Sequence, residues 1–169
     1  RNTRRQRQMC IRDSSLTVRQ ILTLNQFFQH ITICFDGDES GYKAALRAAE
    51  NSIIELKPEK EISFLFLPDK HDPDSFVNEK GKYFFEDFAK GNSVPIHKFI
   101  FNHYSMDMDN NPSSRAIFEK KLRLISSTIK DEFIRKYVLE YFLEKVSELT
   151  PNTNFKYKKN YIKFTKSLK

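Results

Sequence analysis

Two short, almost wholly apolar segments separated by a helical pattern constrain the fold of this chain more than any other feature. Residues 31–35 and 62–67 are rich in β-branched and aromatic side chains, as strands covered on both faces of a sheet are. Between them, residues 42–56 place apolar side chains at helical spacing, and a further helix is expected over residues 16–28. A strand, a helix and a strand within about 35 residues predict a βαβ unit with parallel strands and a right-handed crossover.

The second half of the chain carries helical patterns. Residues 73–89 have an apolar face, with a break expected at Gly81, and residues 94–104 continue as another helix. Two longer helices are expected over residues 115–128 and 131–149, and their Phe and Tyr side chains are interpreted as core. We therefore expect an α/β fold, in which a partial βαβ parallel-sheet unit precedes an all-helical subdomain.

The composition indicates a folded chain without a membrane span. Hydrophobic residues make up 39% and charged residues 30% of the 169 residues, which is enough apolar content to bury a core. No apolar run approaches the roughly 20 residues that a membrane helix needs. The two cysteines do not form a CxxC pair, so neither a disulfide scaffold nor a zinc site is expected.

The net charge of +7 is concentrated at the two ends. Residues 1–14 carry five arginines and one aspartate, and residues 151–169 carry six lysines and no acidic residue. The stretch between them is acidic on balance. The aromatic and lysine residues of the last segment could stack on bases and bind phosphates, or the segment could be a linker.

Two acidic clusters follow the two predicted strands. One is Asp36 and Asp38, separated by Gly37; the other is Asp72 and Asp74, separated by a proline. Since the carboxyl ends of parallel strands meet at one edge of a sheet, both pairs are placed where ligands bind in such folds. Carboxylate oxygens are ligands that Mg²⁺ prefers, and a few of them suffice when a substrate phosphate completes the shell.

The same aspartates have a purely structural interpretation. Asp38 precedes a predicted helix, and Asp72 stands directly before a proline, which is a favourable N-cap arrangement. Lys43 and Arg47, near the start of the helix after Asp38, could face a phosphate or could belong to a solvated helix face. The spacing of the residues leaves both alternatives open.

Two runs of the sequence resemble the Toprim core of bacterial replicative DNA primases of the DnaG type. They are ITICFDGDESGYKAALRA and FLFLPDKHDPDSFVNEKG, against family patterns of DGDxAGxKAA after one strand and LPxGxDPDxF after the next. Ser40 takes the usual small-residue position, and Lys70 and His71 stand where the family often has a glycine. The resemblance extends from Leu16 to about Thr150 and implies a partial Toprim-like fold followed by the family's helical subdomain.

The resemblance implies metal-dependent nucleotidyl transfer that makes short RNA primers on single-stranded DNA during replication. By motif position, Asp36 and Asp38 correspond to catalytic metal carboxylates and Asp72 and Asp74 to further metal-binding acids. The implied cofactor is Mg²⁺ or Mn²⁺. The implied partners are a DNA template, ribonucleoside triphosphates, the RNA primer and, through a domain outside this chain, the replicative helicase. The implied location is cytoplasmic, at replication forks on the nucleoid, with no membrane partner.

Four segments are expected along the chain. Residues 1–14 are a non-native or disordered basic segment, residues 15–91 the Toprim-like part, residues 92–150 the helical subdomain, and residues 151–169 a lysine-rich tail or linker. The family's glutamate-bearing Toprim strand, template-binding portion and zinc domain would lie upstream, so we expect an interior fragment that is inactive alone. The alternatives are another Toprim phosphotransfer enzyme, such as a topoisomerase or nuclease, or a non-catalytic docking module of a replication protein.

Overall fold

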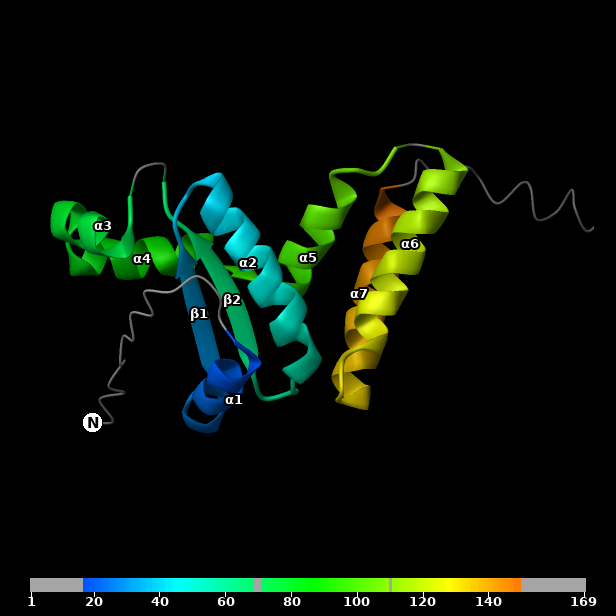
Figure 1. Cartoon of the computed structure of the whole chain (residues 1–169), viewed down its shortest axis with the longest axis horizontal. Helices are drawn as coiled ribbons and strands as arrows, with labels where there is room; N and C mark the ends of the chain where they lie inside the picture. The colour runs from blue at the N-terminus through cyan, green and yellow to red at the C-terminus, as the bar shows by residue number, and fades with distance from the viewer. Residues whose placement is uncertain (1–16, 69–70, 110, 150–169) are drawn as a thin grey trace, which may run out of the picture. The chain divides into compact units, whose positions relative to one another are not determined.

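The computed structural model describes residues 17–68, 71–109 and 111–149 (Figure 1). Its elements, in chain order, are α1 (Val18–Phe27), β1 (His30–Phe35), α2 (Glu39–Ser52), the 3₁₀ helix η1 (Ile53–Glu55), β2 (Glu61–Phe66), α3 (Pro73–Lys80), α4 (Lys82–Asn92), β3 (Val94–Pro95), α5 (Ile96–Ser105), α6 (Pro112–Ser127) and α7 (Glu132–Glu148). The chain divides into two compact units, residues 1–100 and 101–169, and the division falls within α5. The expected segments 1–14 and 151–169 lie outside the described residues.

The sheet of the first unit has the order β1-β2-β3. β1 and β2 are parallel, in register from His30 opposite Glu61 to Phe35 opposite Phe66, with α2 between them in the sequence. This confirms the predicted βαβ arrangement and the α/β fold class. The prediction of a helix from residue 94 is wrong for its first two residues, because Val94 and Pro95 pair antiparallel with β2 before α5 begins.

Helices cover both faces of this sheet. α2 crosses one face (Figure 1), and its alanines Ala45, Ala48 and Ala49 are fully buried, which lets the helix approach the strands closely. On the opposite face, Leu65 and Leu67 form a cluster with the buried Phe76 of α3, and aromatic residues of α4 pack against that cluster. β2 is therefore buried on both faces, as its continuous apolar sequence predicts. The same prediction is wrong for β1, in which Thr32 is exposed and residues 33–35 are half-buried.

Side-chain caps begin the helices close to the predicted positions. The side chain of Thr17 accepts from the backbone N–H of Gln20, and Asn111 and Asp131 cap α6 and α7 in the same way. The break predicted at Gly81 is confirmed, because this glycine has φ 86° and separates α3 from α4. No helix among the described residues is both long and apolar enough to cross a membrane.

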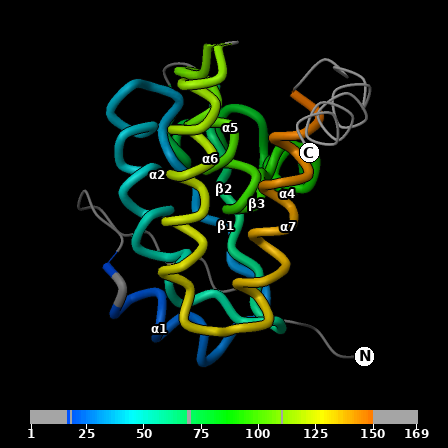
Figure 2. The backbone as a smooth tube through the Cα atoms, turned by 90° about the vertical axis from the view of Figure 1, so that its right-hand side faces the viewer, coloured from blue at the N-terminus to red at the C-terminus, as the bar shows by residue number. Residues whose placement is uncertain are grey.

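In the second unit, α6 and α7 run side by side as an antiparallel pair, joined by a short turn (Figure 2). Their core contains Phe101, Phe118, Leu122, Val138, Phe142 and Val146. The prediction that the Phe and Tyr side chains of these helices are core is wrong for Phe133 and Tyr137, which are 63% and 60% exposed. Ile117 of α6 is 69% exposed as well. Each helix of the pair buries one stripe, and these residues lie off it.

Candidate active site

The first acidic loop joins the end of β1 to the start of α2. Asp36 follows the last residue of the strand, and Asp38 is the N-cap of α2, with its Oδ1 accepting from the backbone N–H of Gly41 at 2.6 Å. Both aspartate side chains are exposed. The structural interpretation of Asp38 as a helix cap is therefore confirmed, and the cap uses one of its two carboxylate oxygens.

The second acidic loop leads from β2 to α3. Asp72 is the N-cap of α3, its Oδ1 accepts from the backbone N–H of Ser75 at 2.7 Å, and the Ser75 hydroxyl bonds back to the Asp72 backbone N–H. Pro73 occupies the first helical turn and Asp74 follows it, so the predicted N-cap arrangement is confirmed here too. The Ser75 hydrogen bonds lower the pKa of the Asp72 carboxyl below its ordinary value.

The two loops touch through backbone at the carboxyl ends of β1 and β2, which lie at the same edge of the sheet (Figure 1). The backbone N–H of Leu67 donates to the carbonyl of Phe35 at 3.1 Å, which extends the strand pairing up to the first loop. A Cβ on Gly37 would overlap the carbonyl oxygen of Leu67 and lie 3.0 Å from the carbonyl carbon of Pro68. Only glycine lets the first loop pass over the end of β2 at this distance.

A cluster of aromatic rings packs around the two ends of the first loop. This cluster was not identified in the sequence analysis. The ring of Phe35 stacks on Phe66 with centroids 5.9 Å apart, and Phe66 stacks on Phe99 of α5 at 5.5 Å. Tyr42, in the first turn of α2, contacts both Phe66 and Phe99. The alternation of phenylalanines along β2 was the available signal, but the contribution from α5 depends on a long-range contact that periodicity does not report.

His71 connects the second loop to α3. Its Nε2 lies 3.5 Å from a carboxylate oxygen of Glu79, and its ring packs edge-on against Phe76. The structure places it in the loop before Asp72, with its side chain packed on the helix that Asp72 caps.

The two basic candidates lie on α2. Lys43 forms an ion pair with Glu39 one turn earlier, and this pairing lowers the pKa of the Glu39 carboxyl. Arg47 is exposed one turn further along the helix. Contact of either side chain with a phosphate stays a prediction.

The donor set of the two loops suits a hard divalent cation whose coordination is completed by other ligands. Within the described ranges 17–68, 71–109 and 111–149, no group of three or more Asp, Glu, His and Cys side chains is close enough to hold a metal ion. The four aspartates Asp36, Asp38, Asp72 and Asp74 supply exposed oxygen donors from two touching loops. Exposed oxygen donors of this kind suit a hard divalent cation that retains waters and shares substrate phosphates.

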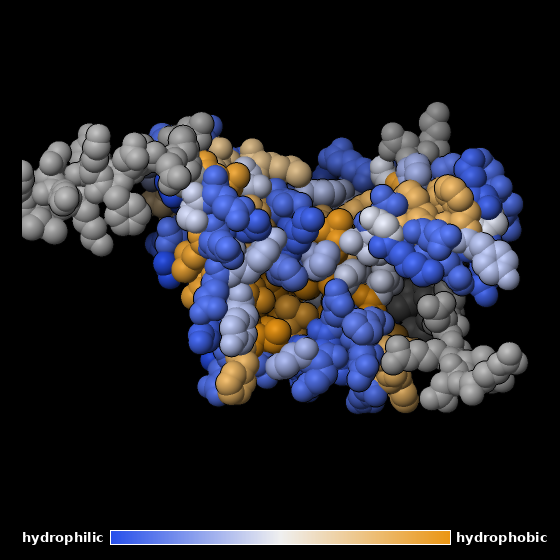
Figure 3. All heavy atoms as spheres, turned by 180° about the vertical axis from the view of Figure 1, so that it is seen from behind, coloured by the Kyte–Doolittle hydropathy of each residue, from blue (hydrophilic) through white to orange (hydrophobic). Residues whose placement is uncertain are grey.

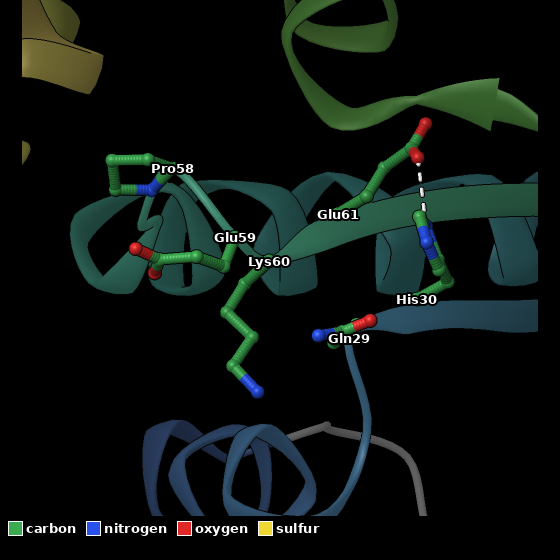
Figure 4. Close-up of a pocket in the computed structure, with 6 residues that line it drawn as sticks. All are labelled: Gln29, His30, Pro58, Glu59, Lys60 and Glu61. Atoms are coloured by element: carbon green, nitrogen blue, oxygen red, sulfur yellow. Dashed lines mark hydrogen bonds and ion pairs between the residues drawn. The ribbon is translucent and has the colours of Figure 1, made fainter.

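A pocket of about 290 Å³ lies at the opposite end of the strands and is not part of these loops (Figure 4). It is lined by Gln29, His30, Pro58, Glu59, Lys60 and Glu61. His30 Nδ1 and Glu61 Oε2 are 3.0 Å apart at its edge, and Lys60 Nζ donates to the carbonyl of Phe28 at 2.9 Å. These contacts link the amino ends of β1 and β2.

The sequence of this chain is similar to a known protein family and to several known proteins. Residues 3–77 match the family described as Toprim-like, whose domains generally bind divalent metal ions. The chain is 41% identical over 92 residues to a DNA primase of Neisseria meningitidis, covering 54% of this chain and 16% of that protein. It is 31% identical over 126 residues to the DNA primase of Escherichia coli K12, covering 74% of this chain and 22% of that protein. The chain thus spans less than a quarter of the length of these relatives.

Solved structures of DNA primases are similar to this chain as well. A DnaG catalytic core superposes with a TM-score of 0.76 at 29% identity, covering 80% of this chain and 44% of that one. A DnaG primase catalytic domain bound to single-stranded DNA superposes with a TM-score of 0.72 at 28% identity, covering 78% of this chain and 43% of that one. The chain is thus similar to bacterial DnaG-type DNA primases along most of its described length, and part of it matches a Toprim-like domain.

Proposed function

We propose that this chain supplies the acidic part of the active site of a DNA primase, which joins ribonucleotides into short RNA primers on single-stranded DNA. The observation that carries the proposal is the contact between the two acidic loops at Gly37 and Leu67, at the carboxyl ends of neighbouring parallel strands. The relatives are named DNA primases, and a similar solved structure is bound to single-stranded DNA.

The residues of the two loops have different proposed roles. Asp36 and Asp38 bind the catalytic divalent ion, with Asp38 doing so through the oxygen that the helix cap does not use. Asp72 and Asp74 contribute to metal binding from the second loop. Lys43 and Arg47 face the phosphates of the incoming nucleotide from α2.

The proposed reaction is nucleotidyl transfer. The oxygen of the primer 3′-hydroxyl attacks the α-phosphorus of a ribonucleoside triphosphate, the bond to the β-phosphate breaks, and pyrophosphate leaves as the hydroxyl proton is lost. Bound Mg²⁺ or Mn²⁺ would neutralise the charge that develops on the phosphate oxygens. The aspartates would hold that ion, and the contact of Gly37 with Leu67 packs the first loop against the end of β2.

Further partners follow from the proposed function rather than from this chain alone. A primase acts in the cytoplasm, at replication forks on the nucleoid, and the replicative helicase would be contacted through a domain outside residues 1–169.

The test uses the longer protein that contains this segment. It separates the effect of the aspartate charge on primer synthesis from the effect of helix capping. Asn caps a helix about as well as Asp, so Asp38→Asn keeps the cap while removing a charged ligand. Asp38→Asn and Asp36→Asn are each expected to lower primer synthesis by about 100-fold or more, because a preorganised charge at the reacting phosphate is lost. Primer synthesis on a single-stranded template is measured by gel electrophoresis of labelled products.

The matched control is Asp87→Asn on α4, which removes an exposed carboxylate paired with Lys90. This control is expected to retain wild-type synthesis. Wild-type synthesis by both Asp36→Asn and Asp38→Asn would reject the proposed site and leave Asp38 with its capping role only.

A further inference from the structure

Aromatic side chains stand at both ends of the first acidic loop. Phe35 is the residue directly before Asp36. Tyr42 lies in the first turn of α2, and its backbone N–H donates to the carbonyl of Asp38 at 3.0 Å. Each ring is thus attached to backbone that continues directly into the segment carrying the two aspartates. The proposed function uses the aspartates and assigns no role to the rings.

Two further rings connect Phe35 and Tyr42 to each other. Phe66 of β2 stacks on Phe35 with centroids 5.9 Å apart and also lies 5.9 Å from Tyr42. Phe99 of α5 stacks on Phe66 at 5.5 Å and meets the Tyr42 ring edge to face at 5.4 Å. These separations are typical of attractive aromatic pairs. The four rings therefore link one end of the loop to the other, and we call them the aromatic cluster.

Phe99 is the most buried member of the aromatic cluster. Hydrophobic residues reach the surface of this chain among hydrophilic ones (Figure 3), but Phe99 is only 5% exposed, whereas the other three rings are half-buried. Its ring also contacts Phe64 of β2 edge to face at 5.2 Å. Close-packed interiors resist changes of shape, so Phe99 can hold the half-buried rings in place.

We propose that Phe99 and Tyr42 are positioning residues for the two aspartates of the first loop. Neither ring touches metal or nucleotide in this proposal, and each acts through the backbone on either side of the loop. The inference rests on the proposed role of Asp36 and Asp38 in binding a divalent ion. Ligands held in place before binding lose less freedom when the ion arrives, so a braced loop binds it more tightly. This gives α5 a part in the site, although α5 carries none of the four aspartates.

Amide hydrogen exchange of the metal-free 169-residue chain tests the positioning without any activity measurement. Phe99→Leu keeps the side chain apolar but removes the ring, and it is expected to speed exchange of the Gly41 and Tyr42 amides about fivefold or more. Both amides bond to Asp38, so their exchange reports opening of the first loop. The amide of Ser75, in the second loop, should exchange at its wild-type rate.

The matched control is Phe101→Leu on the same helix. Phe101 is 6% exposed, and its ring contacts Phe118, Tyr141 and Phe142, none of which belongs to the aromatic cluster. This variant loses a ring of equal burial, so it should leave exchange of the first-loop amides unchanged. If Phe99→Leu does not fold by far-UV circular dichroism, Tyr42→Leu, which removes a half-buried ring, gives the same test at the Gly41 amide.

Primer synthesis by the longer protein adds a metal-dependent measurement. At fixed nucleotide concentration, Phe99→Leu and Tyr42→Leu are each expected to raise the Mg²⁺ concentration for half-maximal synthesis about threefold or more, and saturating Mg²⁺ should restore most of the activity. Tyr42→Phe keeps the ring and should keep the wild-type requirement. Because both leucine variants disrupt one cluster, the double variant should need little more Mg²⁺ than either single variant.

Three outcomes would overturn the inference. The first is wild-type exchange of the Gly41 amide in Phe99→Leu. The second is equal acceleration at Gly41 and Ser75, or the same acceleration in Phe101→Leu, which would make the effect one of general stability. The third is a wild-type Mg²⁺ requirement in both leucine variants while Asp36→Asn lowers synthesis. Failure of the proposed function would look different, since Asp36→Asn and Asp38→Asn would then both retain synthesis.

Discussion

The loops after β1 and β2 both present an aspartate that caps a helix, but they differ in what holds their backbones. The first loop is held by steric contact, since Gly37 lies against the carbonyl oxygen of Leu67 and Gly41 lies against the carbonyl oxygen of Asp36. The second loop is held by hydrogen bonds between Asp72 and Ser75. The first arrangement leaves no room for a side chain at either glycine, while the second can be reproduced by other polar side chains.

This difference suggests that the two loops have different roles in the candidate site. A sterically fixed loop can hold Asp36 and Asp38 in place before any ligand arrives, which is what a preorganised metal site requires. The second loop can adjust its carboxylates when substrate phosphates complete the coordination.

The largest expected effect is on stability, from a methyl group in the first loop. Gly37→Ala should lower the free energy of unfolding by about 3 kcal/mol or more, because the added Cβ overlaps backbone at the end of β2 and that backbone must move. Urea denaturation followed by circular dichroism measures this change.

Gly91→Ala is the matched control, because a Cβ there meets nothing within 4 Å and the residue lies in α4. It should leave stability unchanged or raise it by up to about 1 kcal/mol through helix propensity. Equal stability of the two variants would show that the first loop is no more constrained than an open helical position.

Substitution of the N-cap aspartates should lower stability by a smaller amount, and alanine should lower it more than asparagine. Asp38→Ala is expected to cost about 1 kcal/mol, since the bond to the Gly41 N–H is lost, and Asp38→Asn much less. Asp72→Ala and Asp72→Asn should follow the same order. If the asparagine variants melt as low as the alanine variants, hydrogen bonding does not hold the second loop, and the contrast between the loops fails.

The stability of the protein at acid pH tests how the second loop is held. The pKa of Asp72 is lowered in the folded protein by the Ser75 hydrogen bonds, so its contribution to stability is present above the unfolded pKa of about 4. That contribution is lost as the pH falls through the folded pKa. The urea midpoint of wild type should therefore fall more steeply below about pH 4 than that of Asp72→Asn. Parallel curves for the two proteins would contradict this assignment.

The smallest expected effect concerns the strand that carries the first loop. Burial first, and then the nearby Asp36 carboxylate, raise the pKa of the Cys34 thiol to about 12. At pH 8 the thiolate fraction is then about 10⁻⁴, so alkylation of Cys34 should be far slower in the native than in the urea-unfolded protein. Peptide mass spectrometry after iodoacetamide treatment measures both rates, and equal rates would show that the end of β1 is loosely packed.

The sequence predicted the parts of this fold that local pattern determines. The βαβ unit follows from two apolar runs around a helical pattern, and the start of α3 follows from Asp72 standing before Pro73. Gly81 ends α3 because its φ of 86° suits glycine. These features depend on neighbours within a few residues along the chain.

Long-range contacts account for what the sequence did not predict. β3 has two residues and exists because Val94 and Pro95 meet β2. Phe133 and Tyr137 look like core residues by type, but the α6–α7 pair buries a different stripe. The metal and phosphate roles of the site residues stay predictions, because nothing bound marks them and no group of three ligands is preformed among the described residues.

The most direct test of the central claim is the position of a divalent ion relative to the two loops. Mn²⁺ titrated into the ¹⁵N-labelled chain broadens the amide signals of residues near it, in the presence of a nucleoside triphosphate that completes the coordination. The account predicts selective broadening at residues 36–38 and at 72–74 together, lost in Asp36→Asn. Broadening at only one of the two loops, or equal broadening in Asp36→Asn, would contradict a shared metal site.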